Sequence, residues 1–239
     1  MSNFLILTSL YNGVVGASGV CTRNIVNELQ KNGHSTKVIC YENGKIEKNV
    51  YTISNIKKKS FSVKILETVK GLFFPIIDKN VEKNFVEKLL TLLSQEKIDA
   101  VIGIYFPLET ISVLERVKKY NSEIMTIIYE LDSVGDGIFA STKRSFLAKK
   151  NYENWLKKKY KYIDKVFVMK SHEKYWNEKW GKCYKEKLEV VDIPVLVNRE
   201  QSNKNEMYSN TVSFLYGGLL GMKYRSPEML LKLFDSLSK

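Results

Sequence analysis

Short apolar segments alternate with amphipathic helical segments along most of this chain, and this alternation limits the folds open to it. Near-continuous apolar runs favour buried parallel strands, because such strands are covered on both faces. We expect strands at 4–8, 36–41, 50–54, 99–105, 123–129, 164–169 and 188–191. Helices are expected around 25–30, over 61–97 with a kink at Pro75, and over 108–119, 142–162 and 173–180. The pattern predicts an α/β fold, a doubly wound parallel sheet of Rossmann-like type.

A polar segment rich in Asn and Ser divides the chain near its C-terminal end. Residues 199–210 have no periodic apolar face, so we expect a linker there and one large domain over 1–198. Residues 211–239 hold one apolar run, a glycine pair and one helical pattern. One strand and one helix cannot build a core. The chain is therefore expected to be truncated at the start of a second domain.

Three stretches carry further information when they are taken in order. The first is the opening strand, glycine-bearing loop and helix, closed by Asn32-Gly33-His34; the second is DKVFVMKS over 164–171. The third runs from 191–194 across the linker to 214–231. Together these stretches resemble the GT-B glycosyltransferases, specifically the large retaining group 1 or family 4-like enzymes that build capsule, exopolysaccharide and glycolipids.

The resemblance implies two facing Rossmann-like domains, of which this chain is the N-terminal, acceptor-side half. The full-length protein would transfer a sugar from a nucleotide-sugar to a saccharide or lipid-linked saccharide in cell-surface polysaccharide synthesis. The nucleotide-sugar is a co-substrate, and no cofactor is expected. Because the reaction takes place between the domains, this chain alone should show little or no turnover. Donor-side loop residues implied by the resemblance are Gly217, Gly218 and Arg225.

Glycines recur in the loop after the first strand, at Gly13, Gly16 and Gly19. Glycines let backbone N–H groups approach a ligand, and a following helix N-terminus favours negative charge. These residues are candidate substrate-binding residues, although tight-turn glycines would look the same. Their G-x-x-G-x-x-G spacing does not meet the dinucleotide fingerprint G-x-G-x-x-G. A nicotinamide enzyme with Glu42 on the ribose is therefore the weaker alternative.

Polar side chains follow two later strands at their carboxyl ends, where ligands of open α/β sheets bind. Glu130 and Asp132 are candidate catalytic carboxylates, able to orient an acceptor hydroxyl or to take its proton. Asp136 is a candidate substrate-binding residue, and so is His172 after the strand at 164–169. The two aspartates are equally suited to be turn formers beside Gly135 and Gly137.

Charge is the unusual feature of the composition: 38 Lys and Arg face 26 Asp and Glu, a net charge of +12. A basic helix with aromatic residues is typical of contact with an anionic membrane surface. The candidate contact residues on the 142–162 helix are Lys149, Lys150, Trp155, Lys157 and Lys158. The alternative is that the aromatic residues face the sheet while the lysines face water. Phe73 and Phe74, on the preceding predicted helix, could supply apolar side chains to the same membrane contact.

The remaining composition narrows the classes of function. No nucleic-acid-binding motif is present and the basic excess is almost all Lys, so nucleic acid is not an expected partner. Three scattered cysteines without a CxxC pair, and two histidines, predict reduced thiols and no metal site. We expect a cytoplasmic protein, peripheral on the inner face of the membrane if it binds lipid. The alternative function is a basic α/β binding module without its own catalysis, which binds a membrane, nucleic acid or a separate donor domain.

Overall fold

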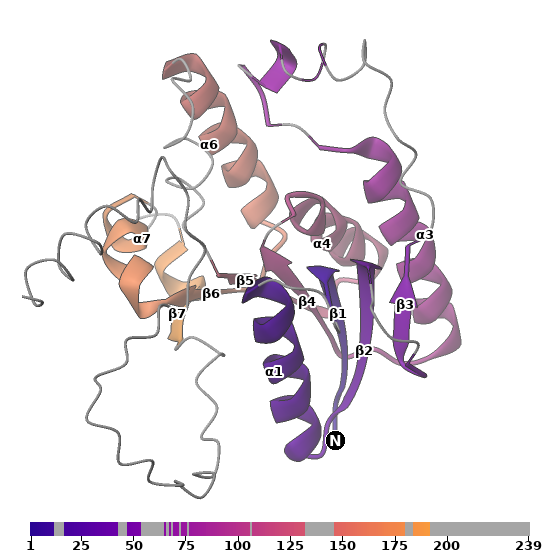
Figure 1. Cartoon of the computed structure of the whole chain (residues 1–239). Coiled ribbons are helices and arrows are strands. Elements are labelled where there is room, and N and C mark those ends of the chain that lie inside the picture. Colours follow the sequence, from indigo (N-terminus) through magenta and orange to yellow (C-terminus); the bar gives the residue numbers. More distant parts are fainter. Residues whose placement is uncertain are drawn as a thin grey trace, which may run out of the picture. The chain divides into compact units, whose positions relative to one another are not determined.

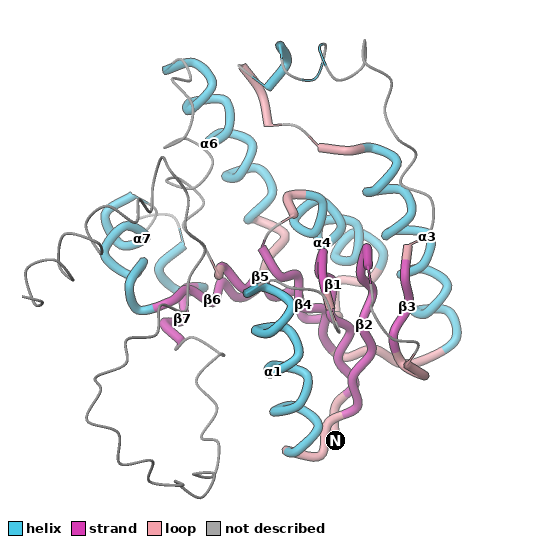
Figure 2. Tube along the Cα trace, viewed as in Figure 1, coloured by secondary structure: helices cyan, strands magenta, loops and turns pink. Residues whose placement is uncertain are grey.

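The fold is taken from a computed structural model of the chain (Figures 1 and 2). The structure describes residues 1–11, 17–42, 47–53, 65, 67, 69–71, 73–75, 77–105, 107–131, 146–179 and 184–191. All of them fall within one compact unit, Met1–Val197. The expected linker at 199–210 and the start of a second domain at 211–239 lie outside the described residues, so the domain division stays a prediction.

In the described part of the chain, seven parallel strands form one sheet in the order β3-β2-β1-β4-β5-β6-β7. The strands are β1 (Asn3–Leu10), β2 (Ser35–Glu42), β3 (Val50–Thr52), β4 (Ala100–Tyr105), β5 (Met125–Glu130), β6 (Lys165–Met169) and β7 (Leu188–Val191). This order is that of a doubly wound sheet with one further strand. The predicted fold class is confirmed.

Helices cover both faces of the sheet. They are α1 (Ala17–Lys31), α3 (Lys79–Gln95), α4 (Glu109–Tyr120), α6 (Phe146–Tyr160) and α7 (Glu173–Lys179), with short 3-10 turns η1 (Lys170–His172) and η2 (Lys185–Lys187). Alternate strand residues face opposite layers. Leu5 and Leu7 of β1 pack in the core with α3, α4, α6 and α7, whereas Ile6 packs with α1. Figure 1 shows α1 on one side of the sheet and α3 and α4 on the other.

The C-terminus of α1 ends in a Schellman motif, as the Asn32-Gly33 sequence predicts. Gly33 has φ 78°, a left-handed conformation that favours glycine. The Gly33 N–H donates to the Gln30 carbonyl oxygen (3.0 Å), and the His34 N–H donates to the Leu29 carbonyl oxygen (3.0 Å). The His34 ring then packs edge-on against Phe4, with ring centroids 5.2 Å apart. His34 thus packs at the junction between α1 and β2, and its Nδ1 accepts the Ser2 N–H (3.3 Å).

The predicted kinked helix at 61–97 is interrupted over a longer stretch than a kink. Among its described residues, 65, 67 and 69–71 are helical, and regular helix resumes only at Lys79. Pro75 lies in the break, where its ring disfavours a continuous helix. Asp78 then caps α3, because its carboxylate accepts the N–H groups of Asn80 (3.0 Å) and Val81 (3.3 Å).

Candidate functional site

The carboxyl edge of the sheet is the candidate site, because ligands of open parallel sheets bind where the strand order reverses. That reversal falls at β1, which pairs with β2 on one side and with β4 on the other. The connection from β1 to α1 covers residues 11–16. Gly19 follows β1, Glu130 ends β5 and His172 follows β6, so the structure brings these three predicted site residues to one edge.

Gly19 lies inside the first turn of α1 and allows the helix to lie against the end of β1. A Cβ atom at this position would lie 3.0 Å from the Tyr11 carbonyl oxygen. A hydroxyl pair also joins the two elements: Thr22 donates to the Ser18 carbonyl oxygen (2.7 Å) and lies 3.2 Å from the Thr8 hydroxyl. The observed role of Gly19 is this close approach, and substrate binding by Gly19 stays a prediction.

Glu130 is completely buried, and the expectation that it begins a polar loop is wrong. It is the last residue of β5, in register with Tyr105 of β4 and Val168 of β6. Its Oε1 accepts a hydrogen bond from the Tyr160 hydroxyl, and its Oε2 accepts one from Trp176 Nε1 (2.9 Å). The Tyr160 and Trp176 rings stack at 5.6 Å. Glu130 therefore joins β5 to α6 and α7.

Burial also sets the charge of this carboxyl group. Removal from water raises the pKa of Glu130, and the two hydrogen bonds lower it. The effect of burial is larger, and the resulting pKa is about 8. The raised pKa favours the protonated form of the group, and both oxygens contact protein side chains. A general base must be deprotonated and within reach of its substrate. The contacts of Glu130 are those of a positioning residue, and its catalytic role stays a prediction.

A second buried carboxyl group at this edge has no counterpart in the sequence prediction. Glu109 begins α4, and its Oε1 accepts the Asp78 N–H at 2.6 Å. The Tyr41 hydroxyl, near the end of β2, donates to the other oxygen at 3.4 Å. Burial raises the pKa of Glu109. This group joins the start of α4 to the start of α3 and the end of β2. The sequence signal for it is an acid in the first turn of a helix, where the helix dipole favours it.

His172 lies in η1, directly after β6, and is partly buried. Its Nδ1 atom is buried and has no hydrogen-bond partner among the described residues. The position at the carboxyl edge agrees with the placement predicted from the sequence, and a role in substrate binding stays a prediction.

Several predicted site residues lie outside the described residues. They are Gly13, Gly16, Asp132, Asp136, Gly217, Gly218 and Arg225. Glu42 does end β2, in register with Leu10, but its side chain is likewise outside the described part.

The basic helix α6 turns most of its aromatic residues inward. Tyr152, Leu156 and Tyr160 are at most 2% exposed and belong to the core. Trp155 is half-buried and stacks on Tyr152 with ring centroids 6.0 Å apart. Lys150, Lys157 and Lys158 are exposed, and the side chain of Lys149 lies outside the described residues. Membrane contact through this helix face stays a prediction, but its apolar stripe is already covered.

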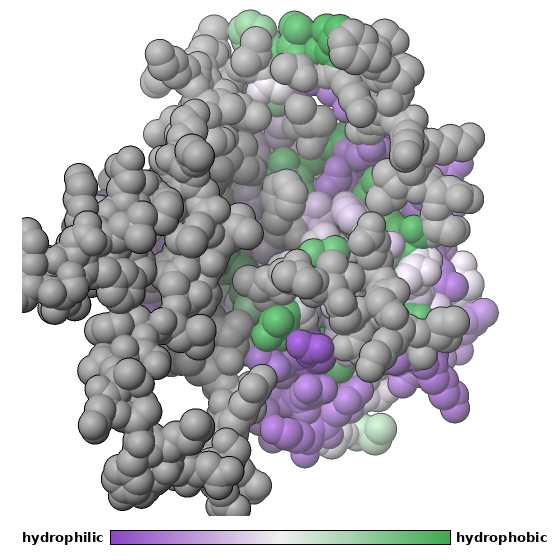
Figure 3. Space-filling model, in the orientation of Figure 1, coloured by the Kyte–Doolittle hydropathy of each residue, from purple (hydrophilic) through white to green (hydrophobic). Residues whose placement is uncertain are grey.

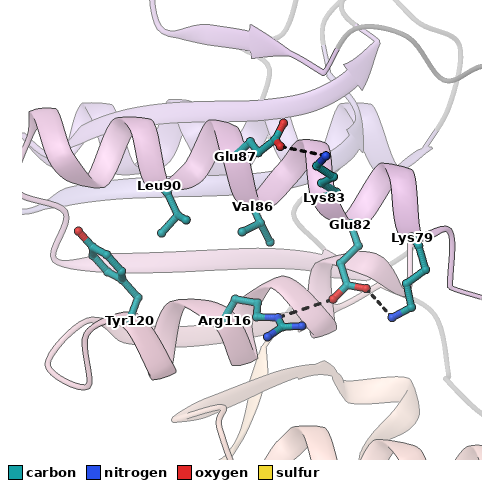
Figure 4. A pocket seen from close by; sticks show the side chains of 8 residues that line it. All are labelled: Lys79, Glu82, Lys83, Val86, Glu87, Leu90, Arg116 and Tyr120. Carbon is teal, nitrogen blue, oxygen red and sulfur yellow. Dashed lines mark hydrogen bonds and ion pairs between the residues drawn. The ribbon is translucent and has the colours of Figure 1, made fainter.

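A shallow groove of about 570 Å³ lies between α3 and α4, away from the sheet edge (Figure 4). Val86 and Leu90 form its apolar part. Its charges pair with one another: Lys79 with Glu82 at 3.0 Å, Arg116 with Glu82 at 3.9 Å, and Lys83 with Glu87 at 3.5 Å. Three cations and two carboxylates thus line the groove, and each of these charges has a partner within it.

Within the described residues, no group of three or more His, Cys, Asp or Glu side chains could hold a metal ion. None of the helices in the described part has the length and apolar character needed to cross a membrane.

Comparisons with known proteins found similar solved structures but no similar sequences. No protein-family profile and no curated protein sequence matches the chain. Among solved structures, it is similar to MurG of Acinetobacter baumannii, with 15% identity, TM-score 0.40, and coverage of 85% of this chain and 48% of MurG. It is similar to a UGT transferase from Siraitia grosvenorii in complex with UDP, with 11% identity, TM-score 0.45, and coverage of 84% and 50%.

A third similar structure is a short chain dehydrogenase family protein from Francisella tularensis, with 14% identity, TM-score 0.34, and coverage of 74% and 76%. The first two neighbours are GT-B glycosyltransferases, and the chain spans about half the length of each. The identities are 15% or less and the TM-scores lie below 0.5, so nothing about the function of this chain is taken from these likenesses.

Proposed function

We propose that this chain is the acceptor-side domain of a GT-B glycosyltransferase. The observation that carries the proposal is the carboxyl edge at the β1–β4 switch point, where residues 11–16 connect β1 to α1. Gly13, Gly16 and Gly19 are spaced G-x-x-G-x-x-G, which does not meet the dinucleotide fingerprint G-x-G-x-x-G. This spacing favours an acceptor loop over a nicotinamide site.

Two of the stretches that carry the family resemblance also have physical roles that suit such a domain. Gly33 ends α1 and aligns β2 beside β1. Asp164, the first residue of DKVFVMKS, fixes the starts of β5 and β6, as described below. The proposed donor is a nucleotide-sugar and the proposed acceptor a saccharide or lipid-linked saccharide of the cell surface. The proposed whole enzyme needs a donor domain in addition to this one.

The test compares the complete product of the gene with residues 1–239. Both are incubated with UDP-, GDP- and ADP-sugars and a bacterial lipid extract, and nucleotide release is measured with and without the extract. We expect extract-dependent release from a product that carries a donor domain, and none from residues 1–239. Turnover by residues 1–239 alone would contradict the two-domain proposal.

A matched pair of glycine variants tests the β1–α1 junction in the complete product. Gly19→Leu should abolish transfer, because its side chain meets the Tyr11 carbonyl oxygen. Gly33→Ala is the control at the opposite end of α1, where an added Cβ atom has open space. Its left-handed backbone should cost about 1–2 kcal/mol of stability and leave transfer intact. Circular dichroism checks that both variants fold.

A binding assay addresses the alternative class of enzyme. Enhancement of NADH or NADPH fluorescence by the chain, without nucleotide release from any sugar donor, would favour the dehydrogenase class instead.

A further inference from the structure

A stripe of large apolar side chains is exposed on the segment that precedes α3. Ile65, Val69 and Phe73 recur at intervals of four and are 51%, 50% and 42% exposed, and Phe74 is 58% exposed. Residues four apart lie on one face of a helix, and the described residues 65, 67 and 69–71 are helical. The N–H groups of Phe73 and Phe74 both donate to the Lys70 carbonyl oxygen, at 3.0 and 2.9 Å. The two phenylalanines therefore directly follow the helical stretch.

This apolar stripe is joined to the basic helix α6. Asn151 Nδ2 donates to the Phe73 carbonyl oxygen at 3.0 Å. The neighbouring Lys150 is exposed, and so is Lys70 within the stripe's own segment. Lys70 thus lies within the segment of the stripe, which also holds Glu67, and Lys150 directly precedes the Asn151 that bonds to it, on a chain whose net charge is +12.

The stripe lies toward the carboxyl end of the sheet, where the candidate site is. In Figure 1 the segment is at the top of the view, the direction in which the carboxyl ends of β1 and β2 point. Figure 3 shows hydrophobic atoms gathered at the same place. An apolar patch of this kind marks an interaction surface.

We propose that Ile65, Val69, Phe73 and Phe74, with Lys70 and Lys150, form a docking surface for an anionic phospholipid bilayer. Apolar side chains enter the boundary between headgroups and acyl chains, and lysines attract the anionic headgroups. The basic rim favours a lipid surface over an apolar protein partner. Phe73-Phe74 belong to the contact predicted from the sequence, whereas Tyr152 and Tyr160 of the predicted α6 face are buried. Docking here does not depend on sugar transfer, so the two proposals can fail separately.

The experiment measures co-sedimentation of the full chain with phosphatidylcholine vesicles, with and without 30% phosphatidylglycerol. We expect binding only to the anionic vesicles. Phe73→Ser combined with Phe74→Ser should weaken it at least about tenfold, since each phenylalanine loses apolar area removed from water. Lys150→Ala should weaken it about fivefold. The matched controls, Tyr120→Ser and Lys31→Ala, change an exposed aromatic residue and an exposed lysine elsewhere and should bind like the wild type.

A spectroscopic readout locates the contact. In a Phe74→Trp variant, tryptophan emission should shift to shorter wavelength on anionic vesicles and be quenched by brominated lipid. Equal binding by the double serine variant and the wild type would overturn the proposal. Binding that is displaced by single-stranded DNA and is insensitive to the phenylalanines would also overturn it, in favour of a general polyanion site.

Discussion

The alternation of side chains along β5 decides the environment of Glu130. Ile128 faces the layer of α4 and α6, so Glu130, two residues later, faces the same layer. There its carboxyl group is enclosed by the Tyr160 and Trp176 side chains, and burial raises its pKa. A folded-state pKa above the unfolded value means that the folded protein holds a proton that the unfolded chain releases.

We expect Glu130 to make the protein less stable as pH rises from about 4.5 to about 8. The stabilising contribution of its proton is complete below the unfolded pKa and is lost as pH passes the folded pKa. Its slope is at most about 1.4 kcal/mol per pH unit. Glu130→Gln replaces the ionisable carboxyl group with an amide that does not titrate. The contribution of Glu130 to the pH dependence of stability should therefore disappear in this variant, as measured by urea unfolding at pH 5 to 8. An unchanged slope in Glu130→Gln would rule out this account.

Glu130→Ala supplies the structural comparison, and we expect it to cost about 2–4 kcal/mol at pH 5. It leaves a cavity and takes the acceptor away from the Tyr160 hydroxyl and Trp176 N–H. Glu189→Gln, at an exposed carboxylate on β7, is the control for both variants and should leave the pH slope intact.

Sequence reasoning at the residue scale succeeds where the signal is local. Asn32-Gly33 predicts the end of α1 because only the nearby backbone determines a Schellman motif. Glu130 was expected in a loop because the strand seemed complete at Tyr129. Its inclusion in β5 depends on pairing with Tyr105 and Val168, which are distant in the sequence. No local pattern carries that information.

At the scale of the elements, one carboxylate holds three of them together. Asp164 Oδ2 accepts hydrogen bonds from the Thr126 N–H (2.8 Å), the Thr126 hydroxyl (3.1 Å) and Lys118 Nζ (2.7 Å). Asp164 precedes β6, Thr126 is in β5 and Lys118 is in α4. These hydrogen bonds lower the pKa of Asp164 although partial burial raises it. Asp164, the first residue of DKVFVMKS, therefore has a structural role: it connects the start of β6 to β5 and α4.

We expect Asp164→Ala to lower the free energy of unfolding by about 2 kcal/mol at pH 7, because charge-assisted hydrogen bonds are lost. Glu189→Ala breaks the more exposed ion pair with Lys165 and should cost less than about 1 kcal/mol. Because the folded pKa of Asp164 is lowered, its contribution should disappear as pH falls through that pKa. Urea unfolding at pH 7, and at successively lower pH below the ordinary pKa of aspartate, checks both. Equal losses in the two variants at pH 7 would contradict the role of Asp164.

The element pattern itself was largely visible in the sequence. Apolar runs located the strands of the sheet to within about two residues at most ends, since parallel strands buried on both faces are apolar throughout. The i, i+4, i+8 spacing of Tyr152, Leu156 and Tyr160 also agrees with the inward stripe of α6. Phe73-Phe74 were predicted as an apolar partner for membrane contact, and both are exposed. The exposure of Ile65 and Val69 was not predicted, because apolar periodicity does not tell which faces are covered.

At the scale of the whole molecule, the reactivity of two buried thiols can report whether the part of the core that packs against α1 becomes exposed to solvent. Cys21 and Cys40 are 4% and 0% exposed and belong to the same cluster. Burial raises the pKa of Cys40 to about 12, and the thiolate is the reactive form.

We expect a Cys183→Ser variant to be almost unreactive toward Ellman's reagent at pH 7.5. Reaction should increase with urea along the same curve as loss of circular dichroism, because both thiols become accessible on unfolding. The same variant, denatured in 6 M guanidinium chloride before the reagent is added, gives the full reaction as the control. Rapid labelling without loss of circular dichroism would show that this layer opens locally.

The strand order also has a consequence for synthesis on the ribosome. β1 pairs with β2 on one side, but its partner on the other side, β4, begins only at Ala100. At roughly 5–20 residues per second, translation of residues 11–99 takes on the order of 5–20 seconds. For that interval one edge of β1, an interior strand of the finished sheet, has no partner. Unpaired strand edges are the kind of surface on which chains pair wrongly. Slower codons before Ala100 would lengthen this period, and the yield of folded protein should fall with them.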